Sequence, residues 1–115
     1  MSLYRHLPGA RLSEAVVANG LIFLAGQVPV DSTADARAQT ADVLAQIDAT
    51  LAELGSDKTR IVDATIFLAD LADYAAMNAA WDAWVVPGQT PARATVEARL
   101  ADPAWKVEIK IVAAR

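Results

Sequence analysis

Two apolar runs joined by a single turn dipeptide constrain the fold of this chain most. Residues 14–18 and 21–25 flank Asn19-Gly20. An Asn-Gly pair readily takes the positive φ angles of a two-residue type I′ turn. The two runs are therefore predicted to form a β-hairpin, which ends before Pro29 because proline has no N–H for a strand ladder.

A helix is predicted after the hairpin. Asp31, Ser32 and Thr33 are candidate N-cap residues, and Gly55 is expected to end the helix at its C′ position. Between them an apolar stripe recurs at helical spacing: Val43, Leu44, Ile47, Leu51 and Leu54. The opposite side carries polar residues: Arg37, Asp42, Gln46 and Glu53. Such a helix is expected to cover a sheet with one side and meet water with the other.

The second half of the chain again alternates strand and helix. Residues 60–70 are β-branched and aromatic, which favours a strand. Its two expected faces carry Val62, Ala64, Ile66 and Leu68 on one side and Asp63, Thr65 and Phe67 on the other. A second helix, capped by Asp73, presents Tyr74, Met77, Asn78, Trp81 and Val85 before Pro87-Gly88. Two closing strands are predicted, one to about Leu100 and one over residues 105–114.

The resulting order, β-β-α-β-α-β-β, predicts an α+β fold in a single domain of residues 1–115. Both helices would cover one face of a mixed sheet. The other face would be uncovered and would carry Thr65, Phe67 and Thr95. We therefore expect subunits to pack there in a closed symmetric oligomer, with Arg93 at the interface.

Composition excludes several kinds of site. The chain has no cysteine, hence no disulfide, thiol nucleophile or thiolate metal site. Its one histidine, His6, is expected to be a frayed terminal residue and not a ligand. The net charge of -4, without a basic cluster, argues against nucleic-acid binding. The apolar stretch 15–26 is shorter than the ~20 residues that span a bilayer and lacks the basic start of a signal peptide, so a cytoplasmic protein is expected.

The segment "PARATVEARL" raises a question about its first arginine. Period-two alternation puts Arg93 and Thr95 on one side of a strand and small apolar residues on the other. Arg93 is either a surface or intersubunit salt-bridge residue, with Glu97 or Glu108 as partner, or a group that binds an anion. Glu108 stands between Lys106 and Lys110 and is equally compatible with a charge ladder between subunits.

Several segments resemble the RidA (YjgF-type) family, in particular its YoaB-like members: "GQVPV", "DATIFLADLADYAAMNAAWDAW", "TPARATVEARL" and "KVEIKIVAA". The resemblance runs from about Arg11 to Ala114. It implies a chorismate-mutase-like fold and a homotrimer around a central barrel, with clefts between subunits. It also implies cofactor-free and metal-free hydrolysis of 2-imino acids, tautomers of 2-enamino acids, to 2-keto acids and ammonia.

The resemblance also implies roles for single residues. Arg93 stands where the family's carboxylate-binding arginine stands, and Glu108 matches the glutamate that positions water and acts as general base. Gly26 matches a glycine whose backbone approaches the substrate closely. Thr95 occupies a position where the backbone carbonyl helps to hold the water, and Asn78 matches an asparagine near the cleft.

Three positions depart from the family pattern. Leu12 replaces a tyrosine that lines the cleft, Ala25 replaces a serine, and Thr95 replaces a cysteine. These changes leave the substrate preference open while Arg93 and Glu108 are retained.

Three functions compete on this basis. The first is a 2-imino acid deaminase, and the second is a trimeric protein that binds keto acids or similar anions without turnover. The third is an endoribonuclease, a label that some relatives carry. The acidic charge and the lack of a histidine pair count against the third.

Overall fold

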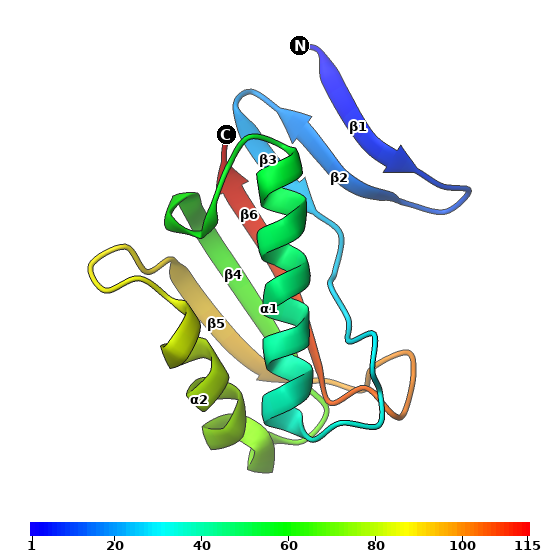
Figure 1. Cartoon of the computed structure of the whole chain (residues 1–115). Coiled ribbons are helices and arrows are strands. Elements are labelled where there is room, and N and C mark those ends of the chain that lie inside the picture. The colour runs from blue at the N-terminus through cyan, green and yellow to red at the C-terminus, as the bar shows by residue number, and fades with distance from the viewer.

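A computed structural model describes all 115 residues. The chain forms one mixed sheet with two helices on one of its faces (Figure 1). The strands are β1 (Leu3–Pro8), β2 (Ser13–Ala18), β3 (Leu21–Leu24), β4 (Ile61–Leu68), β5 (Ala92–Glu97) and β6 (Val107–Ala114). The helices are α1 (Ala36–Glu53) and α2 (Tyr74–Trp84), with short 3₁₀ turns η1 (Lys58–Arg60) and η2 (Leu71–Asp73). The strand order is β1-β2-β3-β6-β4-β5. Only β4 and β5 are parallel, so the predicted mixed sheet with both helices on one side is confirmed.

The predicted hairpin is present as β2 and β3. Asn19 and Gly20 have φ angles of 51° and 75°. Both lie in the left-handed region that a type I′ turn requires. Ala18 therefore pairs directly with Leu21 across the turn.

Helix α1 begins and ends through side-chain and backbone capping. Its N-cap is Asp35, whose carboxylate accepts a hydrogen bond of 2.9 Å from the Ala38 N–H. The predicted caps Asp31, Ser32 and Thr33 are wrong, because Asp31 instead accepts from the Thr33 N–H in a separate turn. Gly55 ends the helix as predicted, with a φ of 78°.

The core lies between the helices and the sheet face that they cover, called here the covered face. The predicted apolar stripe of α1 is buried in it. From the sheet come alternate residues of two central strands: Ala64, Ile66 and Leu68 of β4, and Val107, Ile109, Ile111 and Ala113 of β6. Burying one of the leucine, isoleucine or valine side chains stabilises the fold by about 1.5–3 kcal/mol. The opposite face, called the open face, carries Phe23, Thr65, Phe67, Val96 and Glu108.

Some boundaries differ from the predictions. Val62 is 46% exposed and not part of the core face, because a register shift between Ile61 and Asp63 interrupts the pairing with β6. Strand β5 ends at Glu97 and not near Leu100. The Asp73 side chain makes no capping hydrogen bond to α2.

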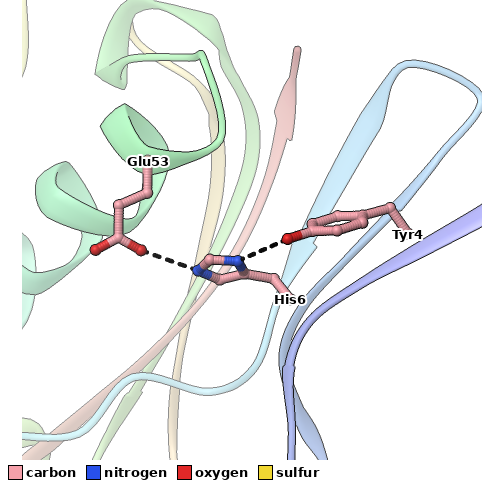
Figure 2. A network of polar contacts seen from close by, with 3 residues as sticks. All are labelled: Tyr4, His6 and Glu53. Carbon is pink, nitrogen blue, oxygen red and sulfur yellow. Dashed lines mark hydrogen bonds and ion pairs between the residues drawn. The ribbon is translucent and has the colours of Figure 1, made fainter.

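An additional edge strand, β1, precedes the predicted hairpin and pairs with β2. His6 lies in this strand and is not frayed. Its Nε2 lies 2.9 Å from Oε2 of Glu53 in the last turn of α1, and its Nδ1 lies 3.3 Å from the Tyr4 hydroxyl (Figure 2). This network ties the edge strand to the helix layer.

Candidate functional site

Arg93 lies on the covered face of the sheet. In the parallel pairing of β4 and β5, Arg93 is opposite Ala64 and Thr95 is opposite Ile66. Residues opposite each other in a ladder share a face, and both β4 residues are fully buried under the helices. The prediction that Arg93 and Thr95 lie on the uncovered face is therefore wrong. Alternation within β5 alone does not say which side faces the helices, because that depends on the register with β4.

Helix α2 holds the Arg93 guanidinium. Arg93 Nη1 donates to Asn78 Oδ1 over 2.8 Å, and Nη2 donates to the Tyr74 hydroxyl over 3.3 Å. The Arg93 Cζ lies 5.2 Å from the centroid of the Trp81 ring and 6.0 Å from that of Tyr74. The three helix residues have the i, i+4, i+7 spacing of one helical stripe. Their planar and polar groups orient the guanidinium from one side.

No carboxylate compensates the charge of Arg93 within the chain. The single salt bridge joins His6 and Glu53. Glu97 accepts instead from the Leu71 N–H over 3.1 Å. The intrachain salt bridge from Arg93 to Glu97 or Glu108 is therefore absent. A cation oriented by neutral acceptors and aromatic rings keeps its capacity to bind an anion.

Glu108 lies on the open face, opposite Phe67 of β4. Gly26 lies beside it, because the next residue, Gln27, pairs with Ile109 through two backbone hydrogen bonds of 2.8 and 3.0 Å. A Cβ atom added to Gly26 would overlap the carboxylate of Glu108. The Glu108 carboxylate therefore lies directly against the Gly26 backbone, while the predicted approach of a substrate to Gly26 stays a prediction.

Glu108 makes no salt bridge with Lys106 or Lys110 in the chain. The Lys110 ammonium donates to the Leu24 carbonyl instead. The carboxylate is therefore free of a cationic partner, as Arg93 is free of an anionic one.

Thr95 and Leu12 complete the predicted set. Thr95 follows Arg93 on the covered face, and its hydroxyl is buried without a hydrogen-bond partner. Leu12 lies in the turn between β1 and β2 and is 57% exposed.

The structure thus brings together Arg93 and Asn78 as one group and Gly26 and Glu108 as another. These two groups occupy opposite faces of the sheet, and Leu12 belongs to neither.

Tyr74 is the residue of this region that the sequence predictions left without a role. Its position on the same helical side as Asn78 and Trp81 was the available signal. What the sequence did not indicate is that the stripe faces Arg93, since that follows from the packing of α2 over β5 (Figure 1).

The pockets of the single chain lie elsewhere. One, of about 540 Å³, lies between α1 and α2 and is lined in part by Asp48, Lys58 and Trp84. The other, of about 640 Å³, lies against the loop after β5 and includes Arg99 and Trp105. Neither contains Arg93 or Glu108, so one chain does not enclose the predicted site.

Other features of the chain bear on the kind of site. Its His, Asp and Glu side chains form no group of three or more placed to hold a metal ion. Neither helix has the length and apolar character needed to cross a membrane. The pKa values of Asp31 and Asp57 are lowered, in each case mainly by a hydrogen bond from the threonine two residues on. Both carboxyls lie in exposed turns and not beside Arg93 or Glu108.

Comparisons with known proteins show the family to which the chain belongs. The model of the family described as endoribonuclease L-PSP matches residues 4–115. The RutC family protein YoaB of Escherichia coli is 56% identical over 114 residues, which cover 99% of each chain. A RutC family protein of Haemophilus influenzae is 54% identical over 114 residues, with 98% of each chain covered. The crystal structure of a YjgF family member from Neisseria meningitidis superimposes with a TM-score of 0.95, at 59% identity, and covers 100% of this chain and 96% of that one.

Proposed function

Because the chain belongs to the endoribonuclease L-PSP family, as a YoaB-like member of its RidA/YjgF group, we propose that it is a 2-imino acid deaminase. The reaction adds water across the C=N bond of a 2-imino acid and releases a 2-keto acid and ammonia. It needs one group that binds the substrate carboxylate and one that activates water. Arg93 and Glu108 are the residues proposed for these roles.

The observation that carries the proposal is the uncompensated and oriented guanidinium of Arg93. A 2-imino acid has its carboxylate next to the electrophilic carbon. Two parallel N–H donors would hold that carboxylate and fix the carbon for attack. Arg93 makes hydrogen bonds only to neutral groups of α2. An incoming carboxylate therefore has no acidic side chain of this chain to displace.

Glu108 is proposed as the general base. Its carboxylate would accept a proton from water as the water oxygen bonds to the imine carbon. Glu108 then gives this proton to the imine nitrogen, which yields a carbinolamine. In the second step Glu108 takes the proton of the carbinolamine hydroxyl and passes it to the amine, so that C=O forms as the C–N bond breaks and ammonia leaves. The absence of a lysine partner keeps the carboxylate available for this exchange. Thr95 is proposed to assist through its backbone carbonyl.

The placement of these residues on opposite faces of one sheet supports a site shared between subunits. Side chains on opposite faces point away from each other. A substrate of a few carbon atoms would reach both only if Arg93 came from one chain and Glu108 from a neighbour. The open face has the apolar character of a buried interface, with Phe23 39% and Val96 42% exposed. We propose a cyclic homotrimer in which the β5 edge of one sheet, with Arg93, meets the open face of the next chain, with Glu108, so that each pair of neighbours forms one cleft.

The test of the function is the decay of enzymatically generated 2-iminopropanoate and 2-iminobutanoate, followed with and without the protein. We expect acceleration by wild type and its loss in Arg93→Ala and Glu108→Gln. Arg99→Ala and Glu14→Gln are matched controls, because they remove an exposed arginine and an exposed open-face glutamate at other positions. Unchanged decay with wild type would reject the deaminase and leave an Arg93-dependent binder of keto acids as the better description.

Complementation tests the shared site directly. Neither Arg93→Ala nor Glu108→Gln is expected to be active alone. If each cleft takes one residue from each of two neighbours, random mixed oligomers should regain about a quarter of the clefts. No recovery after unfolding and refolding the two variants together would contradict a site shared in this way.

An endoribonuclease is the second candidate, supported by the description of the family model. RNA cleavage by a general base would be tested with a fluorescent oligoribonucleotide and the same variants. Cleavage that persists in Arg93→Ala and Glu108→Gln would separate this activity from the proposed imine site.

A further inference from the structure

We infer that Tyr74 is a second carboxylate-binding residue of the Arg93 site, whose phenol O–H donates to the same substrate carboxylate that Arg93 holds. The inference rests on the proposed function, since it requires Arg93 to bind a carboxylate. It adds a residue from α2 to the groups that contact the ligand.

The hydroxyl of Tyr74 carries an uncommitted proton. Arg93 Nη2 donates to this hydroxyl over 3.3 Å, so the phenol oxygen is the acceptor in that bond. The chain offers the phenol proton no acceptor. Tyr74 is 44% exposed. A free O–H donor therefore lies beside a guanidinium that lacks an anionic partner.

The geometry lets one carboxylate meet both donors. A guanidinium has five N–H groups. Nη1 donates to Asn78 Oδ1 and to the Met77 sulfur, and Nη2 donates to the Tyr74 hydroxyl, which leaves one N–H of Nη2 and the N–H of Nε. A carboxylate that accepts from the remaining N–H groups still has lone pairs free. An oxygen bound to Nη2 at ordinary hydrogen-bond length lies close to the phenol oxygen, because both are neighbours of the same nitrogen. The phenol need only turn its proton toward that oxygen.

The role of the hydroxyl is separable from that of the ring. The Tyr74 ring centroid lies 6.0 Å from the Arg93 Cζ, and this contact does not involve the hydroxyl. Tyr74→Phe therefore keeps the ring beside Arg93 and removes only the donor. Since Tyr74 is exposed at the first position of α2, the substitution leaves the core untouched.

The experiment is a calorimetric titration of 2-oxobutanoate, which has the product's keto and carboxylate groups and does not turn over. It compares wild type, Tyr74→Phe and Arg93→Ala. Tyr4→Phe is the matched control, because Tyr4 is the only other tyrosine, is 50% exposed and bonds to His6 in β1. We expect Kd to rise about tenfold in Tyr74→Phe, as for loss of one hydrogen bond to a charged group, and to be unchanged in Tyr4→Phe.

A second ligand distinguishes binding from a structural role. 2-Oxobutanamide has the same carbon skeleton without the carboxylate. Wild type should bind this amide more weakly than it binds 2-oxobutanoate. Wild type and Tyr74→Phe should bind the amide with equal affinity. An equal loss for both ligands would show that the substitution had disturbed the site generally, and this would overturn the inference.

The remaining outcomes separate the inference from the proposed function. If Tyr74→Phe binds 2-oxobutanoate as wild type does while Arg93→Ala does not, the role of Tyr74 is rejected and the Arg93 site remains. If Arg93→Ala binds as tightly as wild type, or wild type does not bind at millimolar ligand, carboxylate binding by Arg93 is rejected and the role of Tyr74 with it. The decay of 2-imino acids tests the deaminase activity separately.

Discussion

Arg93 donates to Asn78 Oδ1 over 2.8 Å, and this neutral amide takes the place that a carboxylate would occupy in an ordinary salt bridge. Asn78→Asp would put a negative charge on the same atom position. The new ion pair would compete with the substrate carboxylate for Arg93. We expect the affinity for 2-oxobutanoate to fall by at least about tenfold in Asn78→Asp and by less in Asn78→Ala.

The control for this prediction is Ala83→Asp. It adds the same charge to α2 at an exposed residue that lines the groove facing α1. It should bind 2-oxobutanoate as wild type does. Equal affinity of Asn78→Asp and wild type, measured by calorimetry, would show that the substrate carboxylate does not meet this side of Arg93.

Gly26→Ala should damage activity without much loss of stability. Gly26 does not have a positive φ, so alanine is acceptable to the backbone there. The added Cβ would overlap the carboxylate at the flexible end of Glu108. We expect the free energy of unfolding to change by less than about 1 kcal/mol while kcat falls about a hundredfold, because the general base is displaced.

A double variant tests the cause of that loss. If Gly26→Ala acts through Glu108, it should have no further effect on kcat in a Glu108→Gln background. Additive losses would instead place Gly26 in direct contact with the substrate, as the family resemblance suggests.

The elements that the sequence predicted correctly are those specified by local patterns. Asn19-Gly20 determines its turn through backbone preference alone, and the stripe from Val43 to Leu54 recurs within one helix. Strand β1 was missed because five of its six residues are exposed and Arg5 and His6 at its centre interrupt any apolar alternation. Its stability comes from pairing with β2 and from the contact of His6 with Glu53, which lies 47 residues away.

The geometry of the candidate site, like strand β1, depends on pairing between distant parts of the chain. The roles of Arg93, Asn78 and Glu108 come from the family resemblance and stay predictions, whereas the predicted face of Arg93 was wrong. Alternation gives two possible faces for β5, and only its register with β4, about thirty residues earlier, selects one. The separation of Arg93 from Glu108 across the sheet follows from that register and was therefore inaccessible to single-strand reasoning.

Thr95→Val should stabilise the chain. The Thr95 hydroxyl is buried and has no hydrogen-bond partner. A buried polar group without a partner costs about 1–3 kcal/mol, and valine has nearly the same shape. We expect the free energy of unfolding in urea to rise by about 1 kcal/mol, at a fixed protein concentration. Thr65→Val on the open face is the control, and a destabilised Thr95→Val would mean that the hydroxyl has a partner in the assembled protein.

The turn before β4 should give a small acid-dependent contribution to stability. The pKa of Asp57 is lowered from its ordinary value of 3.8, first by the hydrogen bond from the Thr59 hydroxyl and then by that from the Thr59 N–H. Since the folded state favours the carboxylate, this contribution is present above pH 3.8 and is lost as the pH falls through the lower folded pKa.

Thr59→Ala removes the larger cause of the lowered pKa, the hydrogen bond from the Thr59 hydroxyl, so the Asp57 pKa in this variant should rise toward the ordinary value. A ¹³C titration of the Asp57 carboxyl measures this change, and the stability difference between Thr59→Ala and wild type should shrink in acid. Asp31 serves as internal control, because its own threonine, Thr33, is unaltered; an unchanged Asp57 pKa would contradict the assignment of the shift to the Thr59 hydroxyl.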